Sequence, residues 1–110
     1  MTDTPSQFVA VAEAADLPPG QMTRVAIDGE RILLANVDGI FYAIRDVCGH
    51  RNAPLSRGKL EGHYVECPLH YALFDVRNGW CVDGPVSTDV PIHEVRIDGG
   101  TVYVRRPAGP

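Results

Sequence analysis

Two short motifs in the middle of this chain, each with one cysteine and one histidine, constrain its fold more than any other feature. The first is Cys48-Gly49-His50 and the second is Cys67-Pro68-Leu69-His70, with sixteen residues between them. Each motif offers one thiolate and one imidazole on a tight loop, because Gly49 permits close backbone approach and Pro68 fixes its own φ. The fold must therefore bring two irregular loops to face each other.

The residues on both sides of the motifs predict antiparallel strands. Four strands are predicted before the first motif: Phe8–Glu13, Met22–Ile27, Arg31–Val37 and Ile40–Val47. Asp28-Gly29 and Asp38-Gly39 between them are typical of hairpin turns in which both central residues adopt positive φ. A short helical turn is expected from Ala14.

The end of the chain alternates with a period of two on both sides of a turn at 98–100. One face of this predicted hairpin holds His93, Val95, Ile97, Val102 and Val104. Such alternation indicates an antiparallel hairpin with one buried face.

The expected fold is all-β, an antiparallel β sandwich or barrel with an inserted loop subdomain. The chain has 110 residues, which suits a single domain. We expect residues 1–44 and 86–110 to form its base, and the segment from about 45 to 85, which is rich in Gly, Pro, Asn and Asp, to form the insertion.

Composition excludes several classes of function. The formal charge is −4, from 10 basic and 14 acidic residues, whereas nucleic-acid binding needs clustered Lys and Arg. No apolar run approaches the roughly 20 residues that span a bilayer. Residues 1–7 carry no basic side chain, which is unlike a secretory signal or transit peptide. We therefore expect a soluble, cytoplasmic protein whose three cysteines serve metal binding more than disulfides.

The order C-x-H followed by C-x2-H resembles the Rieske family, and the resemblance covers nearly the whole chain. In that family two cysteines hold one iron of a [2Fe–2S] cluster and two histidines hold the other. The resemblance implies that Cys48 and Cys67 bind the inner iron, and that His50 and His70 bind the outer iron. It implies one cluster that carries single electrons.

Within that family, the chain is most similar to the soluble ferredoxins of bacterial aromatic ring-hydroxylating dioxygenase systems. Three stretches carry this likeness: Asn52-Ala53-Pro54-Leu55-Ser56 with Gly58, Val65-Glu66-Cys67-Pro68-Leu69-His70, and Phe74-Asp75-Val76-Arg77-Asn78-Gly79. The resemblance implies that electrons pass from an NAD(P)H-dependent flavoprotein ferredoxin reductase to a terminal oxygenase. Both partners would dock transiently over the His50 and His70 tip. The chain would bind no small-molecule substrate and would not be a catalyst alone.

The resemblance also bears on the reduction potential. High-potential members join the cluster loops by a disulfide, and the matching positions here are Ala53 and Leu69. They also place a serine hydroxyl where this chain has Ala72. Fewer hydrogen bonds to sulfur stabilise the reduced state less, so we expect a potential near the low end of the Rieske range, about −150 mV.

Several residues near the motifs receive plainer interpretations. Cys81 is expected to be a spare buried or half-buried thiol, His63 to be solvated, and His93 to be a satisfied structural histidine on an apolar face and not a ligand. A core or lid role is expected for Trp80 and Tyr71. The residues expected to form the docking patch are Pro54, Leu69, Tyr71 and Pro85, and Asp83-Gly84-Pro85 resembles a loop that covers the cluster.

Three alternatives remain open at this point. The chain could be a Rieske-type small subunit of another oxidoreductase, such as a nitrite reductase. It could be a structural zinc module, since two cysteines and two histidines also suit Zn²⁺, although the H-x3–5-H spacing of zinc fingers is absent. It could also be a redox sensor whose reduction changes a partner interface.

Overall fold

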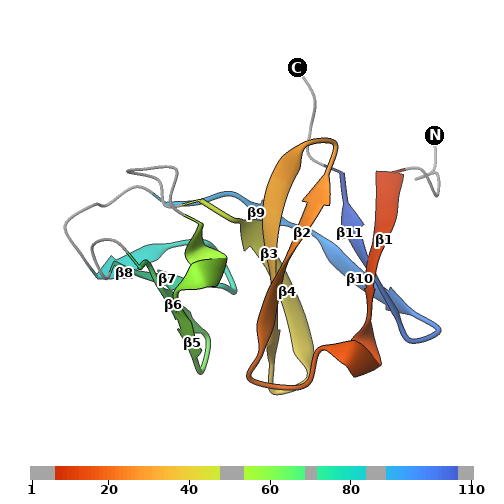
Figure 1. Cartoon of the computed structure of the whole chain (residues 1–110), viewed down its shortest axis with the longest axis horizontal. Coiled ribbons are helices and arrows are strands. Elements are labelled where there is room, and N and C mark those ends of the chain that lie inside the picture. The colour runs from red at the N-terminus through yellow and green to blue at the C-terminus, as the bar shows by residue number, and fades with distance from the viewer. Residues whose placement is uncertain (1–6, 48–53, 69–71, 84–88, 107–110) are drawn as a thin grey trace.

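Three antiparallel sheets make up the computed structural model, which describes residues 7–47, 54–68, 72–83 and 89–106 (Figure 1). The first sheet has the order β1-β11-β10, the second β2-β3-β4-β9 and the third β5-β6-β7-β8. Their strands are β1 (Phe8–Glu13), β2 (Met22–Ile27), β3 (Glu30–Val37), β4 (Ile40–Arg45), β5 (Lys59–Glu61), β6 (Tyr64–Glu66), β7 (Leu73–Asp75), β8 (Cys81–Asp83), β9 (Ile92–His93), β10 (Val95–Asp98) and β11 (Thr101–Arg105). Among the described residues the helical elements are two 3-10 turns, η2 (Ala14–Asp16) and η3 (Leu55–Arg57).

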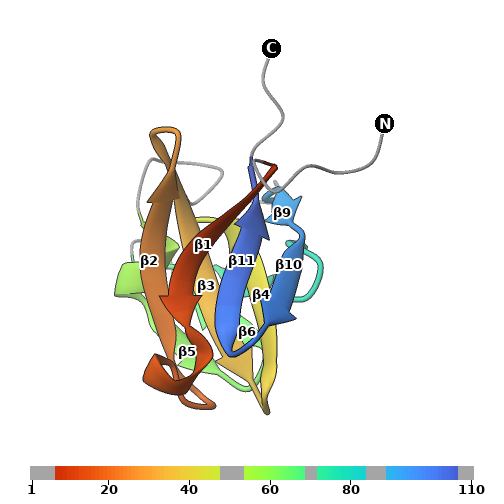
Figure 2. The same ribbon diagram turned by 90° about the vertical axis from the view of Figure 1, so that its right-hand side faces the viewer.

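The first two sheets face each other and enclose one core (Figure 2). The second sheet also packs on the opposite side against the third sheet, which lies apart from β1 and β11 in Figure 1. β3 is the central strand of this arrangement, because side chains alternate across a strand and both of its faces are covered. Ile32 and Leu34 belong to the core shared with the first sheet, whereas Leu33 and Ala35 belong to the core shared with the third sheet.

The predicted hairpin turns are confirmed by the backbone. Asp28 and Gly29 have φ of 52° and 84°, and Asp38 and Gly39 have φ of 53° and 93°. These paired positive values match the right-handed twist of the flanking strands. They fix the registers Ile27↔Glu30 and Val37↔Ile40.

Two predicted strands differ from the structure. β4 ends at Arg45 and not at Val47, although the Asp46 backbone N–H still donates to the Arg31 carbonyl at 2.9 Å in the same register. The strand expected from His93 is split at Glu94: β9 pairs with β4, while β10 pairs with β11. The chain thus crosses from one sheet to another at Glu94. The hairpin of β10 and β11 is confirmed, and Val102 and Val104 are buried.

Ile97 was expected on the buried face, and its side chain is 49% exposed. It pairs with Val102 and shares that residue's face. β10, however, is an edge strand, so no neighbouring strand covers its outer side. Among the described residues, no helix has the length and apolar character needed to cross a bilayer.

Candidate metal centre

The second motif lies in the hairpin loop between β6 and β7. β6 ends at Glu66 and β7 begins at Leu73, and these two residues are paired. The backbone N–H of Cys67 donates to the carbonyl of Ala72 at 2.8 Å, which closes the base of the loop. Cys67 and Ala72 are both fully buried. The hairpin therefore roots Cys67 in the core.

The first motif begins three residues after the end of β4, and a buried carboxylate joins the described residues on both sides of its loop. Asp46 is fully buried and accepts hydrogen bonds from the Ser56 backbone N–H at 2.7 Å and from the Ser56 hydroxyl at 2.6 Å. Arg24 on β2 donates its Nε–H to the same carboxylate at 2.9 Å. A buried charge needs such partners. This contact holds the start and the end of the loop together.

The two loops meet at Gly58. A Cβ atom at this position would lie 1.6 Å from the carbonyl oxygen of Glu66, which is the residue before Cys67. Only a residue without a side chain permits this approach. Leu55 and Cys67 are also buried in the same core cluster. The roots of both motif loops are thus packed directly against each other.

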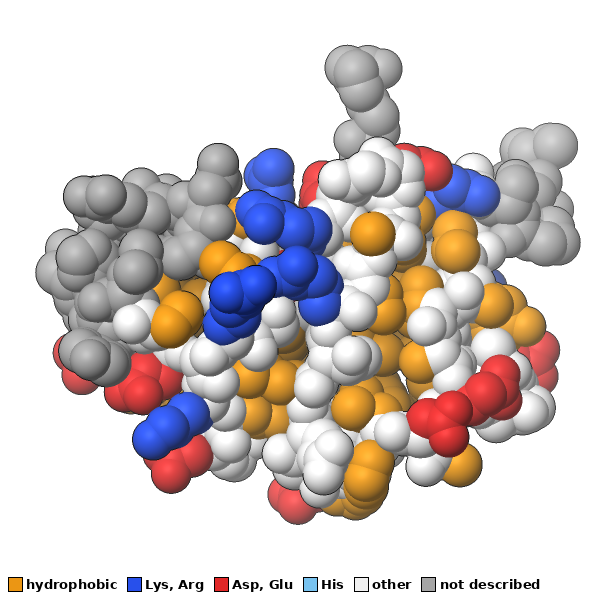
Figure 3. Space-filling view, in the orientation of Figure 1, with side chains coloured by type: hydrophobic (Ala, Val, Ile, Leu, Met, Phe, Trp, Pro, Cys, Tyr) orange, Lys and Arg blue, Asp and Glu red, His pale blue; other side chains and the backbone are white. Residues whose placement is uncertain are grey.

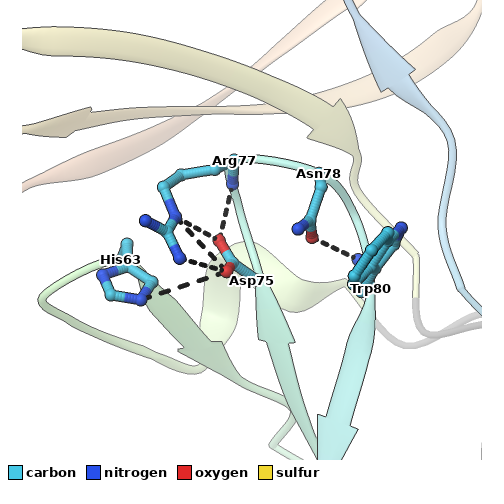
Figure 4. A network of polar contacts seen from close by, with 5 residues as sticks. All are labelled: His63, Asp75, Arg77, Asn78 and Trp80. Atoms are coloured by element: carbon cyan, nitrogen blue, oxygen red, sulfur yellow. Dashed lines mark hydrogen bonds and ion pairs between the residues drawn. The ribbon is translucent and has the colours of Figure 1, made fainter.

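A polar network lies in the third sheet, where β7 ends at Asp75 beside the turn between β5 and β6 (Figure 4). Arg77 donates to the Asp75 carboxylate through Nε at 3.0 Å and through an Nη2–H at 2.8 Å, and its backbone N–H donates at 2.9 Å. The His63 Nε2 atom lies 3.9 Å from the same carboxylate. The hydrogen bond from Arg77 lowers the pKa of Asp75 and outweighs the opposing effect of burial.

Hydrogen bonds also hold the described residues on both sides of positions 84–88. The backbone N–H of Val90 donates to the Gly79 carbonyl at 2.8 Å, and that of Cys81 donates to the Asp89 carboxylate at 2.9 Å. Gly79 has a φ of +78°, and a Cβ there would lie 2.0 Å from the Val90 carbonyl oxygen. Of the predicted covering loop Asp83-Gly84-Pro85, the last two residues lie outside the described residues.

Of the four predicted ligands, Cys67 is described, and Cys48, His50 and His70 lie outside the described residues. Within the described ranges, no three His, Cys, Asp or Glu side chains gather as a metal-binding group. The burial of Cys67 fits a thiolate ligand on the protected side of a metal centre. Ala53, Leu69, Tyr71 and Pro85, which were interpreted with the motifs, also lie outside these ranges, and Pro54 is half-buried.

The structure agrees with some of the plainer interpretations and differs from others. Cys81 is half-buried, as expected, with Sγ 3.7 Å from the Asp83 carbonyl oxygen. His63 is half-buried and stacks on Tyr64 at 4.2 Å between ring centroids, so it is not simply solvated. Trp80 is 60% exposed, which excludes the core half of its expected core or lid role, and the lid half stays a prediction.

The His93 side chain is 8% exposed, in agreement with its expected place on an apolar face. Its Nε2 atom lies 3.2 Å from a Glu30 carboxylate oxygen but makes no hydrogen bond of good geometry. Burial lowers the pKa of His93, and the nearby carboxylate partly offsets this effect. The expectation that His93 is satisfied is therefore wrong for its Nε2 atom, which is buried without a hydrogen-bond partner among the described residues.

Sequence reasoning missed the residues that hold the loops in place. Asp46 and the Asp75–Arg77 pair carried no separate signal, since an acidic residue beside a motif or in a turn is common. Gly58 and Ser56 were noted only as parts of a resemblance. Each becomes informative only when its partner, distant in sequence, is known.

A family model for the Rieske [2Fe–2S] domain matches residues 7–94. Among characterised relatives, the naphthalene 1,2-dioxygenase ferredoxin component of Pseudomonas aeruginosa is 36% identical over 81% of this chain and 86% of its own length. The biphenyl 2,3-dioxygenase ferredoxin component of Rhodococcus jostii is 39% identical over 86% of this chain and 88% of its own length.

Solved structures agree with this match. The ferredoxin of carbazole 1,9a-dioxygenase from Nocardioides aromaticivorans superposes with a TM-score of 0.88 and 32% identity, over 92% of this chain and 99% of its own. A chain from a complex of reduced oxygenase and oxidised ferredoxin of carbazole 1,9a-dioxygenase gives a TM-score of 0.87 at 35% identity, over 90% of this chain and 93% of its own.

Proposed function

The chain belongs to the Rieske [2Fe–2S] family, and we propose that Cys48, His50, Cys67 and His70 hold its single cluster. The observation that carries this proposal is the close approach of Gly58 to the Glu66 carbonyl. That contact brings together the roots of the two loops that contain all four donors. The fully buried Cys67 suits the sulfur-ligated iron, which is the inner one.

The donor set decides what such a site can do. When bound, a [2Fe–2S] cluster takes up and releases one electron at a time. Neutral imidazoles in place of two thiolates make the site less negative, so reduction is easier than with four cysteines. The residues of this chain contribute burial on the cysteine side and a fixed loop base through Asp46 and Ser56.

The protein is a ferredoxin of the kind that serves aromatic ring dioxygenases, and it passes electrons to a terminal oxygenase. It is a carrier and not the catalytic component. We propose that the electrons come from an NAD(P)H-dependent flavoprotein ferredoxin reductase, and that the protein works in the cytoplasm, where such a reductase finds its substrate. Partners would dock at the His50 and His70 tip, where the redox centres of the two proteins come close. The interface would be small and short-lived, because turnover requires rapid release.

The ligand assignment is tested by variants with matched controls. Cys48→Ser and Cys67→Ser are expected to abolish the EPR signal of the dithionite-reduced protein and to lower iron and acid-labile sulfide to background. Cys81→Ser, which changes the third cysteine, is expected to leave both unchanged. His50→Ala and His70→Ala are compared in the same way with His63→Ala. A Cys81→Ser variant without a cluster, or a Cys67→Ser variant with a full one, would contradict the assignment.

The role is tested with purified partners from the same gene neighbourhood. The wild-type protein is expected to couple NAD(P)H oxidation by the reductase to substrate oxygenation by the oxygenase. Omission of the ferredoxin should abolish product formation. Coupled product formation of equal rate in its absence would rule out the carrier role.

A further inference from the structure

Four arginines gather beside the first motif loop, although they come from different elements. Arg24 lies on β2, Arg31 on β3, Arg45 at the end of β4 and Arg57 in η3. Figure 3 shows Lys and Arg side chains gathered in one group on this side of the molecule, next to the grey atoms. We call these four residues the arginine face.

Specific contacts explain why Arg24, Arg31 and Arg57 lie together. Arg45 is paired with Ile32 and so starts from the opposite face of the sheet, and it meets Arg31 at the strand ends, where both line one hollow. Arg24 and Arg31 share one face of the sheet, because Ala26 is paired with Arg31 and alternate residues of a strand point the same way. Arg24 binds Asp46, and the Asp46 backbone N–H donates to the Arg31 carbonyl. Arg57 directly follows Ser56, which also binds Asp46.

A hollow joins this group to the base of the first motif loop. Its volume is about 300 Å³, and it is lined by Asp28, Gly29, Glu30, Arg31, Arg45 and Val47. Val47 is the residue directly before the predicted ligand Cys48. The arginine face therefore borders the loop that carries two of the four proposed ligands.

The guanidinium groups are accessible and only partly neutralised. The Arg24 and Arg45 side chains are 36% and 48% exposed, and Arg57 is exposed. Within the described part of the chain, no carboxylate lies within ion-pair distance of the side chains of Arg31 or Arg57. Asp28 is itself paired with Arg106 at 2.8 Å.

The charge of this face opposes that of the molecule. Four guanidinium groups against the carboxylates of Glu30 and Asp46 leave a local charge of +2. The whole chain carries −4, so the remaining residues together carry −6. Such a separation of charge orients a partner as it approaches.

We propose that the arginine face docks an acidic surface of the redox partner, namely the terminal oxygenase, and so turns the first motif loop toward that partner's redox centre. The proposal rests on the function proposed above and adds the chemistry of the contact. Guanidinium groups are weakly hydrated and bind carboxylates through two parallel hydrogen bonds, which suits a recurrent interface with Asp and Glu. The strongly negative remainder of the chain repels nucleic acid.

The test compares charge changes on the face with the same change elsewhere. Arg31→Gln, Arg57→Gln, Arg31→Glu and Arg57→Glu avoid the Asp46 contacts, and Lys59→Glu on β5 provides the matched control. The readout is the second-order rate constant for reduction of the oxygenase by the reduced ferredoxin, measured by stopped-flow absorbance. A second readout uses ferricyanide and hexaamminecobalt(III), an anionic and a cationic one-electron oxidant.

At low ionic strength, we expect each Glu variant to slow oxygenase reduction about 10-fold and each Gln variant to slow it less. Lys59→Glu should stay within about 2-fold of the wild type, and the differences should shrink near 1 M salt, where the Debye length is about 3 Å. The Glu variants should also react more slowly with ferricyanide and faster with hexaamminecobalt(III).

Rates for the arginine variants that match Lys59→Glu, or that rise, would overturn the proposal while leaving the carrier role intact. Failure of the wild-type protein to reduce the oxygenase would instead overturn the proposed function. In that case the two small oxidants still report whether the arginine face governs approach to the cluster.

Discussion

Replacing Gly58 by alanine probes the contact that joins the two motif loops. The added Cβ would lie 1.6 Å from the Glu66 carbonyl oxygen and 2.9 Å from its carbonyl carbon. The φ of Gly58 is −85°, so left-handed backbone strain plays no part. The overlap can be relieved only if backbone moves, because the atom it meets is not the flexible end of a side chain.

The size of the effect follows from this geometry. Overpacking by a methyl group typically costs about 1 to 3 kcal/mol, and an overlap against fixed backbone belongs at the upper end, about 3 kcal/mol. For a domain of this size, each kcal/mol shifts the melting midpoint by roughly 4 to 8 °C. Gly58→Ala is therefore expected to melt at least about 12 °C below the wild type.

Gly62→Ala in the neighbouring β5–β6 turn is the matched control. Its Cβ would meet no atom within 4 Å, but its φ is +60°, so only conformational strain of about 1 to 2 kcal/mol is expected. The assay is anaerobic thermal melting at one scan rate, followed by measurement of iron and acid-labile sulfide. A Gly58→Ala protein that melts within a few degrees of the wild type and keeps a full cluster would refute the reasoning.

Four further outcomes are expected. Asp46→Ala should destabilise the protein by about 3 kcal/mol, because it leaves a backbone N–H and an arginine without their acceptor; equilibrium denaturation checks this. Arg77→Ala should raise the pKa of Asp75, as measured by NMR titration. Because Arg77 lowers this pKa in the folded protein, the Asp75–Arg77 pair stabilises the fold at pH values above the unfolded pKa of about 3.9. This contribution is lost as the pH falls through the lower pKa of the folded state. His93 should titrate below its ordinary pKa of about 6.5, because burial disfavours its charged form. Its contribution to the free energy of unfolding is therefore present above about pH 6.5 and is lost as the pH falls through the lower pKa of the folded state. An NMR titration at or above the ordinary value would contradict its burial. Redox titration should give a potential near −150 mV, because Ala72 offers no hydroxyl, and a clearly positive potential would count against that interpretation.

Local chemistry determined much of the scaffold. The Asp-Gly pairs at 28–29 and 38–39 specify turns with two positive φ values, and the strands that flank them begin and end within two residues of the predicted bounds. These features depend on residues close together in the chain. The same is true of the spacing within each Cys–His motif, on which the resemblance to the Rieske family rested and which the match of residues 7–94 confirmed.

Other features depend on contacts between segments far apart in the chain, and only the tertiary structure decided them. The alternation from His93 to Ile97 suggests one strand, but the neighbouring strands divide it between two sheets. A buried Asp46 is explained by Arg24 and Ser56, which local sequence does not connect to it. The arginine face likewise arises from four separate elements.

The sequence by itself determined which donor atoms this protein offers and where its chain can turn, because both are properties of neighbouring residues. The packing of sheet against sheet decided how close the described roots of the two loops come and which charges lie beside them. That closeness depends on Gly58 fitting against the Glu66 carbonyl, a fit between surfaces that exists only once the strands have been assembled.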